Sequence, residues 1–350
     1  MPRLRRVDCS RPGMTRRRAG SGFVYLDVHG QRVTDEATLA RIRALAIPPA
    51  WADVWICPWP NGHIQAVGTD AKGRRQYRYH DEWRRRRDQE KFDHMLDFGR
   101  VLPDVRAACL ATLNGSKRTP AMTRERVLAC SVRLLDLGFF RIGTEGYAEE
   151  NQHYGLATIR KDHVKIDDGV VTFDYVAKSG KRRIQSIVDP DVCRIVVALK
   201  RRQGGGPELL AYRKGSAWCD VKSHDINAYI KSLTGADFTA KDFRTWSATV
   251  LATVSVAVAE TVTSPTGRKR VISWAVQEVA HYLGNTPAVC RSSYIDPRVF
   301  DHYQAGATIS AALARLGESV AFGQLSTQGA IEDAVLDLLS DTPVRRRAAA

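Results

Sequence analysis

The sequence of 350 residues is 44% hydrophobic and 26% charged, which is typical of a globular protein with one large or two ordinary domains. Its seven cysteines stand singly with no CxxC pair, which argues against a disulfide framework or a zinc site. The most apolar run, residues 248–262, is too short to span a bilayer. The net charge of +15 favours a polyanionic partner, most simply nucleic acid, so we expect a cytoplasmic, DNA-associated protein.

The first ninety residues fall into two parts. Residues 1–20 contain seven arginines and little that could pack, which predicts a disordered basic arm. Residues 21–90 alternate between short apolar runs and Gly, Pro or Asn turns, so we expect a small, β-rich domain there. Its strands are expected over 23–28, 31–33, 54–57 and 63–68, with one short helix over 34–45.

The last segment of this domain, residues 70–80, interleaves basic residues with tyrosines. Such a pattern suits a surface that lies along a sugar-phosphate backbone, where guanidinium and phenol groups reach phosphates or bases. A solvated edge strand would give the same pattern, so the segment alone leaves both interpretations open.

Residues 91–340 are expected to form a mainly helical domain with a small β meander, followed by a disordered tail over 341–350. The apolar residues recur at three- and four-residue spacing, and the run 264–270 is read as a basic loop. Lys178 lies at the tip of the second hairpin of the meander. The helices are expected over 83–97, 105–114, 123–137, 224–232, 242–260 and 273–283, and the strands over 163–166, 170–177 and 182–188.

The segment 280–296 contains a tyrosine in a defined local setting. Thr286 followed by Pro287 is a typical helix start, and Asp296 before a proline ends the helix. Tyr294 is therefore expected near the end of a short helix, with Asn285 just before its beginning. A single tyrosine is more often a packing residue than a nucleophile, so other parts of the chain must support a catalytic role.

Four segments supply that support: residues 139–151, 175–181, 241–246 and 284–294. Together they resemble the active-site motifs of type IB DNA topoisomerases, in particular the small poxvirus-like branch found in bacteria. The order of Arg, Lys, Arg, His or Asn, and Tyr is shared, and the resemblance extends over residues 22–310. It implies an α+β protein, in which a β-rich DNA-clamp domain precedes the helical catalytic fold shared by topoisomerases IB and tyrosine recombinases.

The resemblance assigns a role to each catalytic candidate. Tyr294 is the nucleophile that forms a 3′-phosphotyrosyl bond, and Arg141 and Arg244 hold the non-bridging oxygens with permanently charged, planar donors. Lys178 is the general acid for the departing 5′-oxygen, with Lys241 assisting. The freed strand then swivels and is resealed, which requires neither ATP nor a metal, so we expect no cofactor.

This chain departs from the poxvirus pattern at one catalytic position. Poxvirus enzymes have His where this sequence has Asn285. An amide donates a hydrogen bond to a phosphate oxygen but carries no positive charge, so we expect weaker stabilisation of the transition state.

The expected partner is duplex DNA, bound by a monomer that closes around it. The resemblance and the basic segments together suggest a set of DNA-contacting residues. These are Arg74, Arg75, Gln76, Tyr77, Tyr79, Tyr147, Thr158, Arg268 and Lys269.

Two other functions fit parts of this pattern. A tyrosine recombinase has a related catalytic set, but it usually has His three residues before the second Arg, where this chain has Lys241. A basic chromosome-binding protein without enzymatic activity would need no nucleophile, so Tyr294→Phe separates binding from catalysis.

Overall fold

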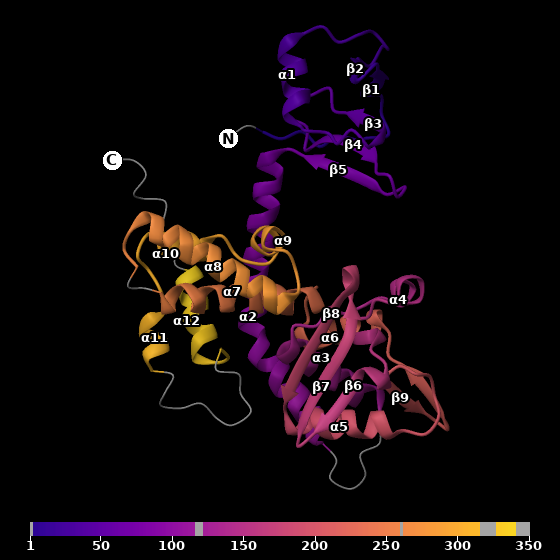
Figure 1. The fold of residues 1–350 in the computed structure, drawn as a ribbon, viewed down its shortest axis with the longest axis vertical. Helices are drawn as coiled ribbons and strands as arrows, with labels where there is room; N and C mark the ends of the chain where they lie inside the picture. Colours follow the sequence, from indigo (N-terminus) through magenta and orange to yellow (C-terminus); the bar gives the residue numbers. More distant parts are fainter. Residues whose placement is uncertain (1–2, 116–121, 260–261, 316–326, 341–350) are drawn as a thin grey trace. The chain divides into compact units, whose positions relative to one another are not determined.

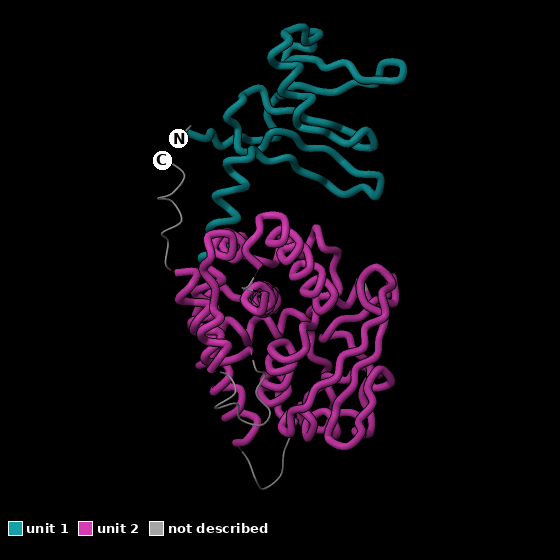
Figure 2. Tube along the Cα trace, turned by 60° about the vertical axis from the view of Figure 1, so that its left-hand side comes forward, with its two compact units in different colours: residues 1–93 teal, residues 94–350 magenta. Residues whose placement is uncertain are grey.

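The structure, a computed structural model, describes residues 3–115, 122–259, 262–315 and 327–340. The chain divides into two compact units, Met1–Asp93 (unit 1) and His94–Ala350 (unit 2) (Figure 2). The division falls inside a long helix, α2 (Asp81–Asn114). Among the described residues, no helix has the length and apolar character that a membrane span requires.

Unit 1 is built on an antiparallel sheet with the strand order β2-β1-β3-β4-β5 (Figure 1). Helix α1 (Glu36–Ala44) begins at the N-cap Asp35, as its sequence predicts, and supplies Ile42 to the core beside the sheet. The strands are β1 (Met14–Ala19), β2 (Gly22–Leu26), β3 (Ala52–Ile56), β4 (Ile64–Thr69) and β5 (Arg75–Tyr79).

The prediction of a disordered arm over residues 1–20 is wrong for the described part. Residues 14–19 form β1, which pairs with both β2 and β3 inside the sheet. Arg16 explains how an arginine-rich segment orders: its guanidinium donates to the carbonyls of Ile47 (3.2 Å) and Trp51 (2.7 Å) and lies 4.1 Å from the Phe23 ring centroid. The aliphatic stems of arginines pack against the sheet while their charged ends reach carbonyls or solvent.

Unit 2 is mainly helical, with two small sheets (Figure 1). The three-stranded sheet has the order β6-β7-β8 and is the predicted meander: β6 (Val164–Asp167), β7 (Val170–Ala177) and β8 (Lys181–Val188). A hairpin, β9 (Ala211–Lys214) and β10 (Ala217–Asp220), forms the other sheet. The predicted α+β fold, with a small β-rich part and a larger helical part, is confirmed.

Helix α7 (Ala240–Val258) is central to unit 2, because it packs against helices before and after it in the sequence. Its Ala, Val and Thr side chains are small enough to let those neighbours approach. The remaining helices are α3 (Arg124–Gly138), α4 (Glu145–Asn151), α5 (Pro190–Arg201), α6 (Ser223–Thr234), α8 (Pro265–Leu283), α9 (Pro287–Ser293), α10 (Arg298–Gln304), α11 (Ser310–Ala314) and α12 (Ala330–Ser340).

Two of the predicted helix boundaries are wrong. The helices expected over 83–97 and 105–114 are one helix, α2, which continues through Pro103. The predicted basic loop 264–270 is instead the start of α8: the Ser264 hydroxyl accepts a hydrogen bond from the Gly267 amide (3.1 Å), and Pro265 occupies the first turn. A serine N-cap followed by proline is a helix start, and here it prevails over the loop signal of Pro and Gly.

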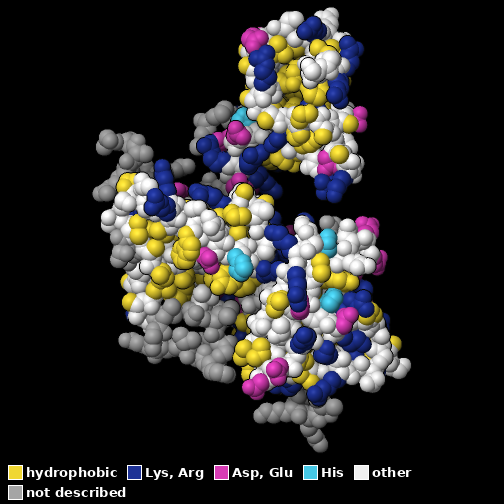
Figure 3. Space-filling view, viewed as in Figure 1, with side chains coloured by type: hydrophobic (Ala, Val, Ile, Leu, Met, Phe, Trp, Pro, Cys, Tyr) yellow, Lys and Arg dark blue, Asp and Glu magenta, His cyan; other side chains and the backbone are white. Residues whose placement is uncertain are grey.

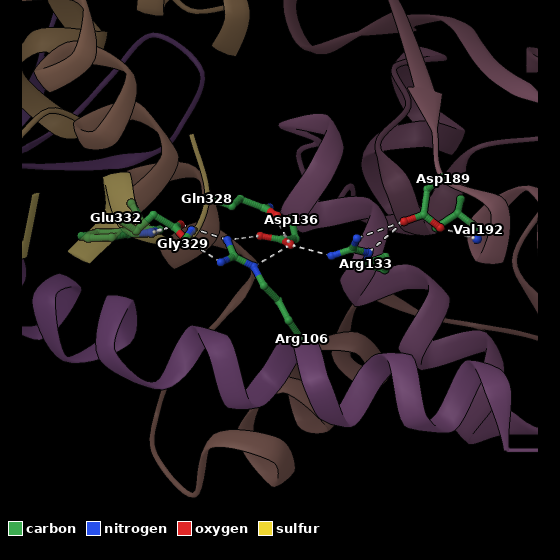
Figure 4. Close-up of polar contacts among 9 residues, drawn as sticks. Arg106, Arg133, Asp136, Asp189, Val192, Gln328, Gly329 and Glu332 are labelled. Atoms are coloured by element: carbon green, nitrogen blue, oxygen red, sulfur yellow. Dashed lines mark hydrogen bonds and ion pairs between the residues drawn. The ribbon is translucent and has the colours of Figure 1, made fainter. Parts of the chain in front are cut away.

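A buried ionic network joins α2, α3, α5 and α12 (Figure 4). Arg106 of α2 pairs with Asp136 of α3 (2.9 Å) and with Glu332 of α12 (2.5 Å). Arg133 bridges Asp136 (3.4 Å) to Asp189 (3.0 Å), the N-cap of α5. Each guanidinium in this network, called the structural cluster below, is neutralised by carboxylates. The network therefore fixes four helices of unit 2 to one another.

Candidate active site

The candidate site is built around the carboxyl end of α8. The helix ends at Leu283, and Gly284 adopts the left-handed conformation (φ 63°), so the chain reverses there. The amide of Asn285 donates to the Ala280 carbonyl (3.0 Å), which completes the helix cap. Thr286 then caps α9 through its hydroxyl, which accepts from the Val289 amide (3.4 Å). The predicted helix start at Thr286 and Pro287 is confirmed.

Three arginines from distant parts of the chain converge on this helix end. Arg141 follows α3, Arg183 lies on β8 and Arg244 lies on α7. Their guanidinium groups donate to consecutive carbonyls: Arg183 to residues 281 (3.0 Å) and 282 (2.5 Å), Arg244 to residue 283 (2.9 Å), and Arg141 to residue 284 (2.9 Å). The carbonyls at the end of a helix lack intrahelical partners and carry its negative dipole, so they attract cations.

Asn285 is oriented for donating a hydrogen bond. Its Oδ1 accepts a hydrogen bond from Arg141, which leaves the amide nitrogen as the donor of the side chain. Among the described residues, buried side-chain donors without a partner include Asn285 Nδ2 and Arg244 Nε. A buried donor without an acceptor is costly, so two of them at one site indicate an acceptor that binds there.

Tyr294 is held at the end of α9 as the sequence predicts. Its backbone amide donates to the Cys290 carbonyl (3.0 Å), and its own carbonyl accepts from Thr249 of α7 (3.3 Å). The half-buried ring lies beside Arg244, whose guanidinium carbon is 5.3 Å from the ring centroid. Helix α7 thus positions the arginine and fixes the backbone of the tyrosine.

The charge of this site is not neutralised. Within the described part of the chain, no carboxylate forms an ion pair with Arg141, Arg183 or Arg244. Burial, and then the neighbouring charge of Arg141, lowers the pKa of Arg244 to about 10, while Tyr294 opposes that shift. Arg244 therefore stays protonated at neutral pH and is charged, 4% exposed and without an anion.

The structure does not bring the two candidate lysines into this cluster. Lys178 is exposed in the turn between β7 and β8, where Ser179 and Gly180 both have positive φ (69° and 70°). Lys241 is exposed in the first turn of α7, three residues before Arg244. Across the described residues, neither lysine has a side-chain hydrogen bond or ion pair, so both ammonium groups are available to a ligand.

Sequence reasoning missed Arg183. On β8, the outward-facing Arg182 pairs with Asp174 (2.6 Å), whereas Arg183 and Gln185 turn toward the body of the unit. Successive side chains of a strand point to opposite faces of the sheet, so the sequence does indicate that one of two adjacent arginines faces the body of the unit. The sequence does not indicate which of the two arginines faces inward.

In unit 1, β5 divides the predicted DNA-contacting residues between its two faces. Arg75, Tyr77 and Tyr79 alternate on the exposed face, and the two tyrosine rings stack with centroids 5.9 Å apart. Gln76 lies on the other face and donates to Asp70 (2.9 Å), and Arg74 pairs with the same carboxylate (2.8 Å). The exposed face has the stacked aromatic and basic character that a nucleic-acid surface needs.

In unit 2 the remaining predicted contacts are placed unevenly. Thr158 is buried, and its hydroxyl bonds to the backbone of Gly155. Arg268 donates to the carbonyls of Val262 (3.2 Å) and Gln304 (2.5 Å), while Lys269 is exposed. The side chain of Tyr147 lies outside the described part of the structure.

Exposed cations also gather on the sheet of unit 2. Lys165 and Arg182 are exposed on one face of β6 and β8, and Figure 3 shows Lys and Arg side chains spread over the sheet with few acidic ones. Lys181, exposed at the start of β8, lies on the opposite face. A surface of this charge attracts a polyanion over distances comparable to the Debye length.

Comparisons with known proteins place the chain in a family. Residues 80–320 match the family model for the catalytic core of eukaryotic DNA topoisomerase I, and residues 22–70 match the model for the N-terminal domain of bacterial DNA topoisomerase IB. The first match alone covers more than half of the chain and includes every member of the arginine cluster.

Individual relatives come from viruses and fungi. DNA topoisomerase 1B of Acanthamoeba polyphaga mimivirus is 32% identical over 83% of this chain and 88% of its own length. DNA topoisomerase 1B of vaccinia virus (strain Copenhagen) is 22% identical over 67% of this chain and 71% of its own. DNA topoisomerase 1 of Schizosaccharomyces pombe is 24% identical over 57% of this chain and 23% of its own. On its fold, its site and these similarities, the chain belongs to the type IB DNA topoisomerases.

Proposed function

We propose that this topoisomerase relaxes supercoiled duplex DNA through a transient nick in which Tyr294 is joined to the 3′-phosphate. The observation that carries the proposal is the un-neutralised arginine cluster beside that tyrosine, with two buried donors unpaired. A phosphodiester supplies both the missing negative charge and the missing acceptors. The same group carries the phosphorus atom that the phenol oxygen attacks.

The residues divide the chemistry as follows. Arg141, Arg244 and Asn285 bind the non-bridging oxygens, which gain charge as phosphorus becomes five-coordinate. The Tyr294 oxygen forms a bond to phosphorus and gives up its proton to solvent, while the bond from phosphorus to the 5′-oxygen breaks. Lys178, assisted by Lys241, protonates that oxygen so that it leaves as a hydroxyl. Religation runs these steps in reverse.

The reaction conserves the energy of the phosphodiester bond. One phosphate ester replaces another, so cleavage and religation need no external source of energy. The rotation of the nicked strand is driven by the torsional stress of the supercoiled DNA. We therefore propose that the enzyme needs neither ATP nor a divalent metal, because the guanidinium groups supply the positive charge that a metal would otherwise provide.

We further propose that the protein acts as a cytoplasmic monomer. The exposed face of β5 in unit 1 and the basic sheet face of unit 2 are the proposed contacts to the duplex. Contacts between basic side chains and phosphates release counterions from DNA. We therefore expect the logarithm of the DNA-binding constant to fall linearly with the logarithm of the salt concentration.

The test is relaxation of supercoiled plasmid in EDTA without nucleotide, followed by a denaturing quench and peptide mapping. We expect relaxed plasmid and a covalent adduct on the peptide that contains Tyr294, linked to the 3′ side of the nick. Tyr294→Phe should bind DNA and form no adduct. Tyr229→Phe on α6 is the matched control and should behave as wild type. A strict requirement for magnesium or ATP, or an adduct at another residue, would contradict the proposal.

A further inference from the structure

Arg183 is the one member of the arginine cluster to which the proposed chemistry gives no role. Its guanidinium reaches from β8 to two successive carbonyls at the end of α8, those of His281 and Tyr282. A single side chain thus supplies two donors to this helix end. The contact is close: a Cβ added at Gly284 would lie 3.1 Å from Arg183 Nη1.

The position of Arg183 in the hairpin relates it to Lys178. The last paired residues before the turn are Ala177 and Lys181, and Arg183 pairs with Tyr175 two steps further down. Lys178 is the first residue of that turn. Counted from the turn, Arg183 is therefore the first residue of β8 whose side chain bonds to the helix end.

The other end of the same contact leads to the phosphate-binding residues. The carbonyls that Arg183 binds are followed directly by Leu283 and Gly284, whose carbonyls accept from Arg244 and Arg141. Asn285 comes next in the chain. A displacement of the hairpin away from the helix end would therefore move Lys178 relative to all of these groups.

We propose that Arg183 is a positioning residue. It links the hairpin that carries Lys178 to the end of α8, and so holds the ammonium group of Lys178 close to the 5′-oxygen of the bound phosphodiester. This inference rests on the proposed function. Arginine suits the task because its planar fork spans two carbonyls and its permanent charge complements the helix end. In Arg183→Lys the single ammonium group keeps the charge but lacks the paired donors of the guanidinium, so we expect it to restore the link only in part.

For measurements without DNA, Arg182 provides a matched control on the same strand. Its guanidinium pairs with Asp174 on the exposed face and makes no bond to α8. Arg183→Met and Arg182→Met each remove one guanidinium from β8 and keep similar volume. Only the first removes the link to the helix end.

The first measurement is hydrogen exchange of the full-length protein without DNA. We expect Arg183→Met to increase deuterium uptake in the peptides that cover residues 176–186 and 280–286, whereas Arg182→Met leaves the second peptide unchanged. Equal uptake in the two variants would overturn the proposed link. This measurement does not depend on catalysis.

The second measurement is single-turnover cleavage of a duplex with either an ordinary 5′-oxygen or a 5′-sulfur leaving group. A thiolate leaves without a proton, so only the oxygen substrate depends on the general acid, a dependence of about 100-fold or more. We expect Arg183→Met to cleave the oxygen substrate at least about tenfold more slowly and the sulfur substrate at nearly the wild-type rate. Arg183→Lys should recover part of the loss, and Lys178→Ala should show the same pattern.

Two results would overturn the inference: an equal loss on both substrates, which is the mark of a structural role or of a defect in phosphate binding, or no loss on either. Failure of the proposed function has a different signature, since the wild type would then form no Tyr294 adduct with either substrate. In that event the proposed role in catalysis falls with it, and hydrogen exchange still decides whether Arg183 fastens the hairpin.

Discussion

Unit 2 contains two groups of buried or half-buried arginines that differ in what surrounds them. In the structural cluster, Arg106 and Arg133 are paired with Asp136, Asp189 and Glu332. In the arginine cluster of the candidate site, called the site cluster below, Arg141, Arg183 and Arg244 donate to backbone carbonyls and to one side-chain amide oxygen. No carboxylate among the described residues forms an ion pair with them. Carbonyls fix a guanidinium in place without cancelling its charge.

The difference shows in the proton affinities of the two groups. Burial alone would lower the pKa of Arg106, but Glu332 and Asp136 outweigh it and raise the pKa above its ordinary value. Burial and the nearby Arg141 lower the pKa of Arg244 to about 10. Carboxylates of the protein neutralise the structural cluster, whereas we propose that the phosphodiester of bound DNA neutralises the arginines of the site. On this proposal, the partners of the arginines separate a fold-stabilising group from a functional one of the same residue type.

The largest effect is expected on stability, from Arg106→Met. The substitution leaves the carboxylates of Asp136 and Glu332 buried near one another, so the free energy of unfolding should fall by about 3–5 kcal/mol. Denaturant unfolding measures it. Arg100→Met, on the exposed side of the same helix, is the control and should cost less than about 1 kcal/mol.

The cleavage rate should respond differently to Arg106→Met. At a temperature where the variant is folded, single-turnover cleavage should stay close to the wild-type rate, because Arg106 lies in the structural cluster. A large loss of cleavage by the folded variant would show that the two clusters are not separable.

The opposite pattern is expected for Arg244→Gln. Losing one charged donor at the transition state should slow cleavage by about 100-fold, equivalent to about 3 kcal/mol. No carboxylate loses its partner, so the free energy of unfolding should change by only about 1–2 kcal/mol, as for the hydrogen bonds that the guanidinium donates to the carbonyls of Phe139 and Leu283. Quench-flow cleavage together with thermal unfolding tests both parts. Strong destabilisation with an unchanged rate would reverse our assignment.

A smaller effect is expected from Asn285→Ala. It removes one neutral donor, so cleavage should slow by about tenfold, as expected for the loss of about 1.4 kcal/mol. Asn285→His should retain the wild-type rate or exceed it, because a protonated imidazole adds charge as well as a donor. If Asn285→Ala cleaves as fast as wild type, the unpaired amide has no part in binding the phosphate.

The two clusters also differ in how far the sequence predicts them. Arg141, Arg244 and Tyr294 lie in short segments whose flanking residues carry the resemblance, so the sequence alone identifies them as catalytic candidates. The structural cluster cannot be identified in this way, because Arg106 and Glu332 are 226 residues apart and each looks like a surface charge on a helix. Only the packing of α2 against α12 brings them together.

Strand β1 and Arg183 were missed for a related reason. In both places the sequence shows adjacent arginines, and hydrophobic periodicity does not indicate which of them packs. The burial of an arginine depends on carbonyls supplied by other segments, such as those of Ile47 and Trp51 for Arg16. The sequence does identify the start of α9, since Thr286 and Pro287 act within one helical turn.

The most direct test of the account is Asn285→Asp. The side chains have nearly the same shape, but the carboxylate would pair with Arg141 and make the site cluster resemble the structural one. Single-turnover cleavage and denaturant unfolding should be measured on the same preparation. We predict an unchanged or higher free energy of unfolding together with cleavage slowed by about 100-fold or more, since charge stabilisation of the transition state is lost. Cleavage within about threefold of the wild-type rate, a difference below 1 kcal/mol, would contradict the claim that an uncompensated positive charge is what this site provides.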